Sequence, residues 1–196
     1  MPLSQQNFLL AAAFIMPLTF SVWQALLNNF AVERAAFTGA EIGMLQSLRE
    51  VPGFLAFTAV FLLLIVREQR IALTALLVMS VGVALTPFFP TTYGLYATTV
   101  LMSMGFHYFE TINKSLTLQW IEKIETAHFM GRALAVKAAG ALLAYSSIWM
   151  LMEWAGFGFK AMYLLAGGVG VVITLALWAV FPHFPEGAVQ HKKLVM

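Results

Sequence analysis

Long apolar runs separated by short polar connections make up most of this chain. An α-helix rises about 1.5 Å per residue, so roughly 20 apolar residues are needed to cross about 30 Å of hydrocarbon. Runs that meet this length lie at about residues 7–31, 40–66, 71–89, 93–117, 133–155 and 159–181. These runs lack the alternation of barrel strands, and backbone polar groups in lipid must be satisfied within their own segment. The pattern therefore predicts an all-α membrane protein with six transmembrane helices.

The composition excludes a soluble domain. Hydrophobic residues make up 61% of the chain, charged residues make up 10%, and the mean hydropathy is +0.83, whereas soluble proteins carry about 25% charged residues. There is no cysteine, so neither a disulfide framework nor a thiolate metal site can form. The basic residues lie in the connections, which is typical of membrane topology signals and speaks against a nucleic-acid partner.

The distribution of basic residues predicts the orientation. With a cytoplasmic N-terminus, the outer connections carry only Arg34 and Lys160. The cytoplasmic side then carries Arg67, Arg70, Lys123, Arg132, Lys192 and Lys193. We therefore expect a transmembrane bundle over residues 1–181 and a cytoplasmic linker or tail over 182–196. The protein is expected in the bacterial inner membrane, with both termini on its cytoplasmic side. Trp120 to Glu125 is predicted to form a short amphipathic helix at the cytoplasmic surface.

Polar residues are concentrated in four of the six spans. Spans three and six are almost entirely apolar and are expected to form a scaffold. Spans one, two, four and five carry amides, hydroxyls and charges at helical spacing and are expected to share a wet interior. Because an apolar span closes each triplet, the pattern indicates two three-helix inverted repeats, a symmetry that is common in transporters.

Span four carries the clearest polar stripe. Its members follow one another at steps of three or four residues: Tyr96, Thr99, Ser103, His107, Glu110, Lys114 and Thr117. A charge near the bilayer centre costs about 2.5–3.5 kcal/mol on insertion scales, so Glu110 and Lys114 should face a cavity or a partner. They could simply form an i,i+4 salt bridge, or Glu110 could be a proton or solute site. His107 and Glu110 suit a proton relay better than a metal site, because no second pair of this spacing exists.

Span two places Gln46, Arg49 and Glu50 near mid-membrane. Arg49 retains its proton, so it needs a counter-charge, which could be Glu50, Glu110 or an anionic solute. A structural Arg–Glu lock and a solute-binding arginine are both open. Pro52 is expected to kink this helix. Gly39, Gly43 and Gly53 are expected to admit a close neighbour.

Spans one and five contribute further polar groups. Gln24 and Asn28 lie on one face of span one, at a depth similar to that of Arg49, and could either bond to a neighbouring helix or face a solute. In span five, Tyr145 lies near the middle, whereas Lys137 is expected to extend to the membrane surface. The candidate solute-binding residues are thus Gln24, Asn28, Gln46, Arg49 and Tyr145, with Glu50, His107, Glu110 and Lys114 as proton-coupling residues or a buried charge network.

Together, six spans, a basic two–three connection, Gly131-Arg132-Ala133 at the start of span five and the glycines between Gly39 and Pro52 resemble the N-terminal half of a major facilitator superfamily transporter. The resemblance implies a gating role for Arg67, Glu68 and Arg70. The family's Gly and Asp before these bases are absent, as are its helix-four Arg and the rest of its antiporter signature, so antiport is not supported.

The resemblance implies half of a secondary active transporter that moves a small polar or charged solute by alternating access, with proton coupling through Glu110 and His107. The expected partners are the lipid bilayer, the solute and a second six-helix half, which is either the rest of a longer chain or a second copy in a homodimer. No cofactor, metal or enzymatic activity is expected. The alternatives are a non-transporting scaffold or sensor whose buried charges pair, and an intramembrane enzyme built on His107 and Glu110, for which no nucleophile is identifiable.

Overall fold

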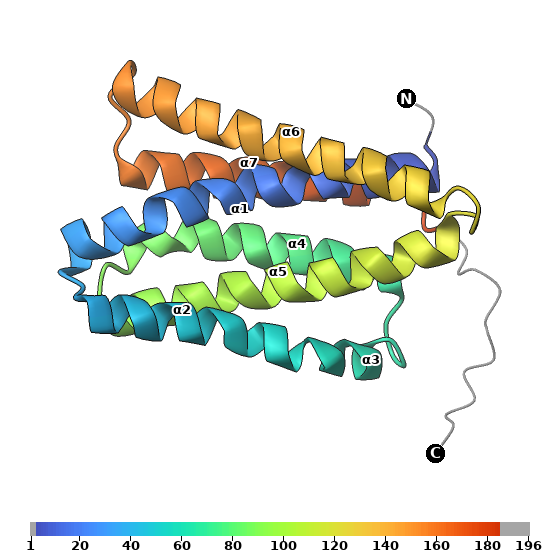
Figure 1. The fold of residues 1–196 in the computed structure, drawn as a ribbon, viewed down its shortest axis with the longest axis horizontal. Coiled ribbons are helices and arrows are strands. Elements are labelled where there is room, and N and C mark those ends of the chain that lie inside the picture. Colours follow the sequence, from blue (N-terminus) through green and yellow to red (C-terminus); the bar gives the residue numbers. More distant parts are fainter. Residues whose placement is uncertain (1–2, 185–196) are drawn as a thin grey trace.

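The computed structural model describes residues 3–184, and these form an all-helical bundle whose long helices lie side by side (Figure 1). The predicted all-α class is confirmed for this part of the chain. The helices are α1 (Gln5–Ala35), α2 (Gly39–Phe54), α3 (Ala59–Leu62), α4 (Glu68–Leu85), α5 (Thr92–Trp120), α6 (Thr126–Glu153) and α7 (Phe159–Val180), with 3₁₀ turns η1 (Leu55–Thr58) and η2 (Thr86–Phe88). Most of the predicted tail, including Lys192 and Lys193, lies outside the described residues.

Side-chain caps define where several helices begin. Ser4 precedes α1, and its hydroxyl accepts a hydrogen bond from the backbone N–H of Asn7 at 3.3 Å. Thr91 does the same for α5 through the N–H of Gly94 at 3.2 Å. Before α2, the Glu41 carboxylate accepts a hydrogen bond from the backbone N–H of Thr38 at 2.6 Å. Each cap satisfies an N–H that the first helical turn leaves unpaired.

The predicted second span is interrupted shortly after Pro52. The α-helix changes to the 3₁₀ turn η1 at Leu55, and α3 then continues the run. Pro52 lacks a backbone N–H and its ring crowds the carbonyl of Leu48, four residues earlier, yet α2 remains α-helical past it, so the change at Leu55 lies beyond the part of the helix on which the proline acts. Thr58 stabilises the turn by donating to the carbonyl of Leu55 at 2.8 Å, and its hydroxyl also meets that of Tyr108 on α5.

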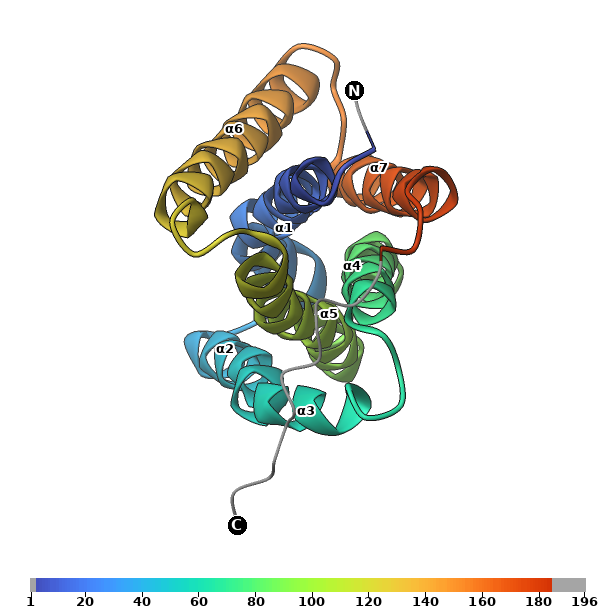
Figure 2. The same ribbon diagram turned by 90° about the vertical axis from the view of Figure 1, so that its right-hand side faces the viewer.

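Helix α1 runs through the centre of the bundle (Figure 2). It packs against α6 on one side and α7 on another, while α4 packs against α5 and α7, and α2 packs against α5. The core is therefore rich in α1 residues, among them the fully buried Phe8 and Trp23, together with Leu76 of α4 and Phe109 of α5. Among the long helices, α2 and α6 have the fewest buried residues, and both lie at the edges of the bundle (Figure 2).

Small residues allow several of these helices to approach closely. A Cβ atom at Gly140 of α6 would lie 2.6 Å from the carbonyl oxygen of Phe14 on α1, and one at Gly105 of α5 would contact the backbone of Met79 on α4. The predicted close neighbour of Gly39 and Gly43 is wrong within the described chain, since no other atom comes within 4 Å of a Cβ placed there. These two glycines lie on the uncovered side of α2.

The connection between α5 and α6 differs from the prediction. Instead of a surface helix from Trp120 to Glu125, α5 continues to Trp120, a short turn follows, and α6 begins at Thr126. Trp120 packs edge-on against Phe8 of α1, with ring centroids 5.8 Å apart, so this end of the segment is drawn into the bundle. Gly131-Arg132-Ala133 consequently lies inside α6 rather than at its start.

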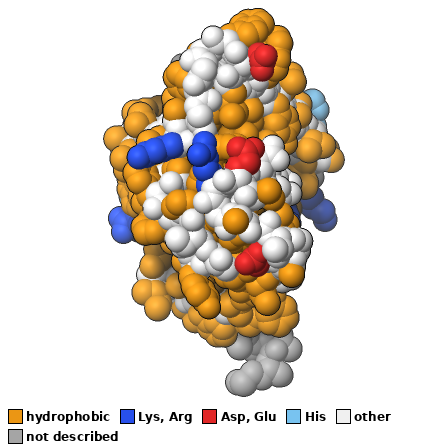
Figure 3. Space-filling view, turned by 90° about the vertical axis from the view of Figure 1, so that its left-hand side faces the viewer, with side chains coloured by type: hydrophobic (Ala, Val, Ile, Leu, Met, Phe, Trp, Pro, Cys, Tyr) orange, Lys and Arg blue, Asp and Glu red, His pale blue; other side chains and the backbone are white. Residues whose placement is uncertain are grey.

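Four of the described helical segments are long and apolar enough to cross a membrane: α1, Glu68–Phe88, α6 and α7. Predicted spans two and four are not among these four segments, and the structure shows why. Helix α5 has sufficient length but carries the polar stripe, and α2 is cut short by η1. The flanks of the bundle are nonetheless largely hydrophobic around the end that Figure 3 shows, where the few charged side chains are of both signs.

Candidate functional site

Polar side chains of α1, α2 and α5 lie close together, since side chains of α2 contact Asn28 of α1 and His107 of α5. In Figure 2, α2 and α6 lie on the side of α1 and α5 that is away from α4 and α7. On α1, Gln24 and Asn28 are exposed although their neighbours Trp23 and Leu27 are fully buried. Helix α1 therefore has one face in the core and another that the described chain leaves open.

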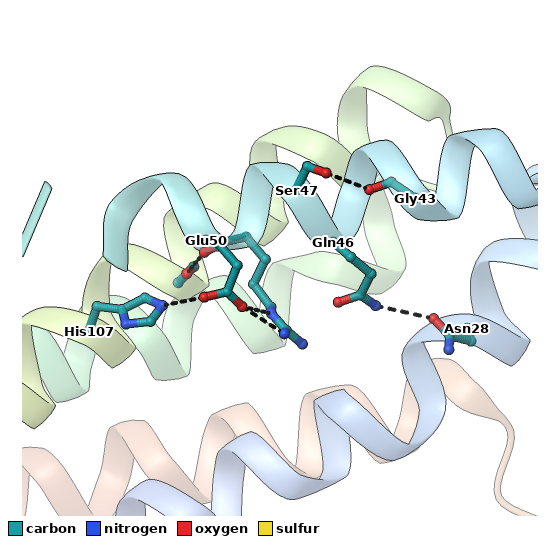
Figure 4. A network of polar contacts seen from close by, with 8 residues as sticks. Asn28, Gly43, Gln46, Ser47, Glu50 and His107 are labelled. Atoms are coloured by element: carbon teal, nitrogen blue, oxygen red, sulfur yellow. Dashed lines mark hydrogen bonds and ion pairs between the residues drawn. The ribbon is translucent and has the colours of Figure 1, made fainter. Parts of the chain in front are cut away.

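A network of charges joins α2 to α5 on this open side. Arg49 donates two hydrogen bonds to Glu50 Oε1, from Nε at 3.0 Å and from Nη2 at 2.7 Å. Glu50 Oε2 lies 3.8 Å from Nε2 of His107, which points from α5 toward α2 in Figure 4. Ser103 donates to the backbone carbonyl of Arg49, and a Cβ at Gly53 would lie 2.8 Å from the His107 ring. The glycine thus makes room for the imidazole between the helices.

A bond between amides links α2 to α1 beside this network. The side chain of Gln46 reaches across the gap to Asn28, and its Nε2 donates to Asn28 Oδ1 at 3.5 Å (Figure 4). This pair is the contact between helices that the prediction left open as the alternative to a solute-facing role. Asn28 is exposed and Gln46 is half-buried, and an amide has more donor and acceptor sites than this one bond uses, so both amides keep hydrogen-bonding capacity for a further partner.

A second group of charges joins α5 to α6. Nζ of Lys137 lies 2.5 Å from Oε1 of Glu110, and Nζ of Lys114 lies 3.7 Å from Oε2 of the same carboxylate. The prediction that Lys137 extends to the membrane surface is wrong, because its ammonium group is held by Glu110. Sequence reasoning missed this pair because it started span five at residue 133, whereas α6 begins at Thr126 and places Lys137 more deeply.

Apart from Lys114, which lies about 9 Å from the end of α5, the charges of both groups lie in the middle part of their helices, with α2, η1 and α3 taken together as one. His107 is about 22 Å from the first residue of α5, a helix about 43 Å long. Glu110 lies about 15 Å from the other end of α5, and Lys137 lies about 16 Å from the start of α6. Since ionisable residues at such depth are costly in lipid, they are expected to serve either structure or transport.

Several predicted site residues are not drawn into these networks. Tyr145 is about half exposed on α6. The predicted wet stripe of α5 is only partly wet: Thr99 and Thr117 are buried, and the hydroxyl of Thr117 bonds back to the carbonyl of Asn113 at 2.8 Å. A stripe defined by spacing alone includes positions that the rest of the bundle covers, so spacing could not separate the buried positions from the open ones.

The predicted gating connection is tied to neighbouring segments. Glu68 accepts a hydrogen bond from Nε2 of Gln119 on α5 at 2.6 Å. Its neighbour Gln69 is buried and holds the chain beyond α7, donating to the carbonyl of Pro182 and accepting from the N–H of Phe184, both at 3.0 Å. Arg67 and Arg70 flank these contacts at the same end of the bundle. In residues 3–184, no group of three or more His, Cys, Asp or Glu side chains is placed to hold a metal ion.

Comparison with known proteins identifies the fold. No protein-family model matches the sequence. No curated protein matches it either. The helical arrangement, however, is similar to part of a membrane transporter of known structure. That protein is the POT family transporter PepTSo, solved in meso, to which this chain is similar with a TM-score of 0.66 and 18% identity. The match covers 94% of this chain and 39% of the transporter, so the chain spans about two fifths of that protein's length.

Proposed function

We propose that this chain is the N-terminal half of a secondary active transporter of the major facilitator type, which moves a small polar or charged solute by alternating access. The observation that carries the proposal is the gathering of mid-membrane charges and amides on one side of a bundle with a transporter fold. Transporters place their solute near the bilayer midplane, between two such bundles. The open side would then line the solute pathway.

The packing of the helices supports two inverted repeats of three. In this arrangement α1, α2 and α4 form the first repeat, and they correspond to α5, α6 and α7 of the second. Exchanging corresponding helices turns the α1–α6 contact into the α5–α2 contact. It also turns the α1–α7 contact into α5–α4 and returns α4–α7 to itself, and all of these pairs pack together. Helices α1 and α5 begin at opposite ends of the bundle (Figure 1), as inverted repeats require. The proposal therefore counts six crossings, with α2, η1 and α3 as the second.

The orientation follows from charge. The first described residues, the α3–α4 and α5–α6 connections and the end of α7 share one end of the bundle (Figure 1). That end carries Arg67, Arg70 and Lys123, whereas Arg34 and Lys160 lie toward the other. The positive-inside rule therefore places the first end in the cytoplasm, in our proposal that of a bacterium. There, Arg67, Glu68 and Arg70 would gate access, supported by the bond between Glu68 and Gln119.

Within this proposal, the amides of Gln24, Asn28 and Gln46 and the hydroxyl of Tyr145 hydrogen-bond the solute. Glu110 and His107 couple proton movement, and they do so through different partners, since Glu110 is paired with Lys137 and His107 lies beside Glu50. The open side requires a second six-helix half, supplied by further chain or by a second copy.

A second candidate is a membrane scaffold or sensor. The Arg49–Glu50 and Glu110–Lys137 pairs favour it, because each already neutralises its own charges without a solute. The two functions differ in whether water reaches the open side from both faces of the membrane.

Cysteine labelling distinguishes these functions, since the native chain contains no cysteine. We would place Gln24→Cys in the outer half of α1 and Thr111→Cys in the inner half of α5, both at exposed positions, with Leu165→Cys on α7 as a lipid-facing control. An impermeant maleimide is applied to either side of membranes that contain the full-length protein. Alternating access makes both site cysteines reactive from both sides and leaves the control unreactive. Labelling of each site from its nearer side alone would refute the transporter.

A further inference from the structure

The three charged groups that join α5 to α6 are unequally satisfied. Lys137 forms a close ion pair with Glu110 at 2.5 Å, and the two side chains are 25% and 19% exposed. The Lys114 side chain is 69% exposed, and its Nζ lies 3.7 Å from Glu110 Oε2, which is beyond hydrogen-bond distance. Lys114 therefore keeps its N–H donors available on the open side of the bundle.

The charges on this side do not balance. In the two charge groups, as far as residues 3–184 form them, three cations, Arg49, Lys114 and Lys137, face two acids, Glu50 and Glu110. Arg49 gives two hydrogen bonds to Glu50, and Lys137 holds Glu110. The unmatched positive charge is thus that of Lys114. His107 is either neutral or positively charged, so it cannot supply the missing negative charge.

The Lys114 side chain also points toward the middle of the membrane. Side chains in a helix lean toward its N-terminus, which for α5 is the end away from the α5–α6 connection. The contact of Lys114 with Glu110, one turn earlier, shows this direction. A lysine that extended to the nearer surface would point the other way, toward Trp120.

We propose that Lys114 binds the negative group of the transported solute, and that the solute is a small molecule with a single negative charge. This inference rests on the proposed function and gives its solute class. One negative charge neutralises the site, whereas a neutral or cationic solute would leave the Lys114 charge unmatched inside the solute site. The expected anion-binding role of Arg49 thereby passes to Lys114, because Arg49 is already occupied by Glu50.

An acid from the second six-helix half is the competing partner for Lys114. Such an acid would pair with Lys114 whether or not a solute is bound. In that case, anion binding by the protein would not depend on this side chain, which is a difference that an experiment can measure.

The test is thermal unfolding of the purified full-length protein with a library of small monocarboxylates, neutral polyols and amides, and amines. We expect the compounds that raise the melting temperature to be monocarboxylates. Lys114→Gln should weaken their binding about ten- to a hundredfold, as loss of a hydrogen bond between charged groups does. Lys114→Arg should retain binding, and Lys123→Gln, in the exposed α5–α6 turn, should match the native protein.

Three outcomes would overturn the inference: stabilisation by neutral or cationic compounds alone, monocarboxylate binding that Lys114→Gln leaves unchanged, and no stabilisation by any monocarboxylate. An unliganded melting temperature of Lys114→Gln close to that of the native protein shows that the variant is folded. Because unfolding reports binding and cysteine labelling reports access, the two proposals can fail separately. If both cysteines are labelled from both sides but binding does not depend on Lys114, the proposed solute class is refuted and the proposed transport function is not.

Discussion

The ion pair between Glu110 and Lys137 should be a principal link between α5 and α6. We would replace each residue by alanine, alone and together, and measure the free energy of unfolding for all four proteins. Breaking a fully buried pair costs about 3–5 kcal/mol, whereas an exposed pair contributes about 0–1 kcal/mol. With both side chains about one fifth to one quarter exposed, we expect each single alanine to cost on the order of 2 kcal/mol after screening by water.

The double-alanine variant separates the energy of the Glu110–Lys137 interaction from the other effects of each substitution. Removing the second charge should cost little once the first is absent, so the coupling energy should be on the order of 1–2 kcal/mol. The contact between Glu110 and Lys114 is the internal control, because its greater distance and exposure predict a coupling below about 0.5 kcal/mol. Unfolding in mixed detergent micelles would supply these energies. Equal couplings for the two lysines, or strict additivity at Glu110 and Lys137, would refute the assignment.

Three further predictions concern packing and hydrogen bonds. Gly140→Ala should lower the melting temperature by several degrees in a thermal scan, because the added Cβ meets the α1 backbone, whereas Gly131→Ala has open space and should be neutral or stabilising. Gln69→Leu should lose about 1 kcal/mol for each of its two bonds to the segment beyond α7 and should speed hydrogen exchange at Phe184; unchanged exchange would contradict this. Arg49→Lys should lower the melting temperature, because one ammonium group cannot reproduce the paired donors that bind Glu50, and a melting temperature equal to that of the native protein would show that the pair is dispensable.

Hydropathy predicted the helices well because each segment has to be apolar along most of its length. The predicted starts of spans one, two, four and six lie within about two residues of α1, α2, α5 and α7. The late start predicted for α6 also follows from defining each span by its apolar run. Its first two turns include His128 and Arg132, which belong to the helix but not to the apolar run, so the prediction began the span too late.

The pairing of charges could not be read from the sequence. Span four offered Lys114 as the partner of Glu110 through helical spacing. The closer partner, Lys137, lies on α6, which packs against α1 as α5 does, and this shared neighbour is not visible in the sequence. Arg49 shows the opposite case. Glu50 was one of three possible counter-charges, and it is the adjacent one that the geometry selects.

The edge helices have mechanical consequences for the bundle. Helix α2 rests mainly on α5, and α6 rests mainly on α1, whereas α4 is wedged between two neighbours. A tilt of either edge helix disturbs one packing surface, while a tilt of α4 disturbs two. The bundle should therefore be stiffest around α4 and its neighbours α5 and α7. The helices that tilt most easily should be α2 and α6, which flank the two charge groups.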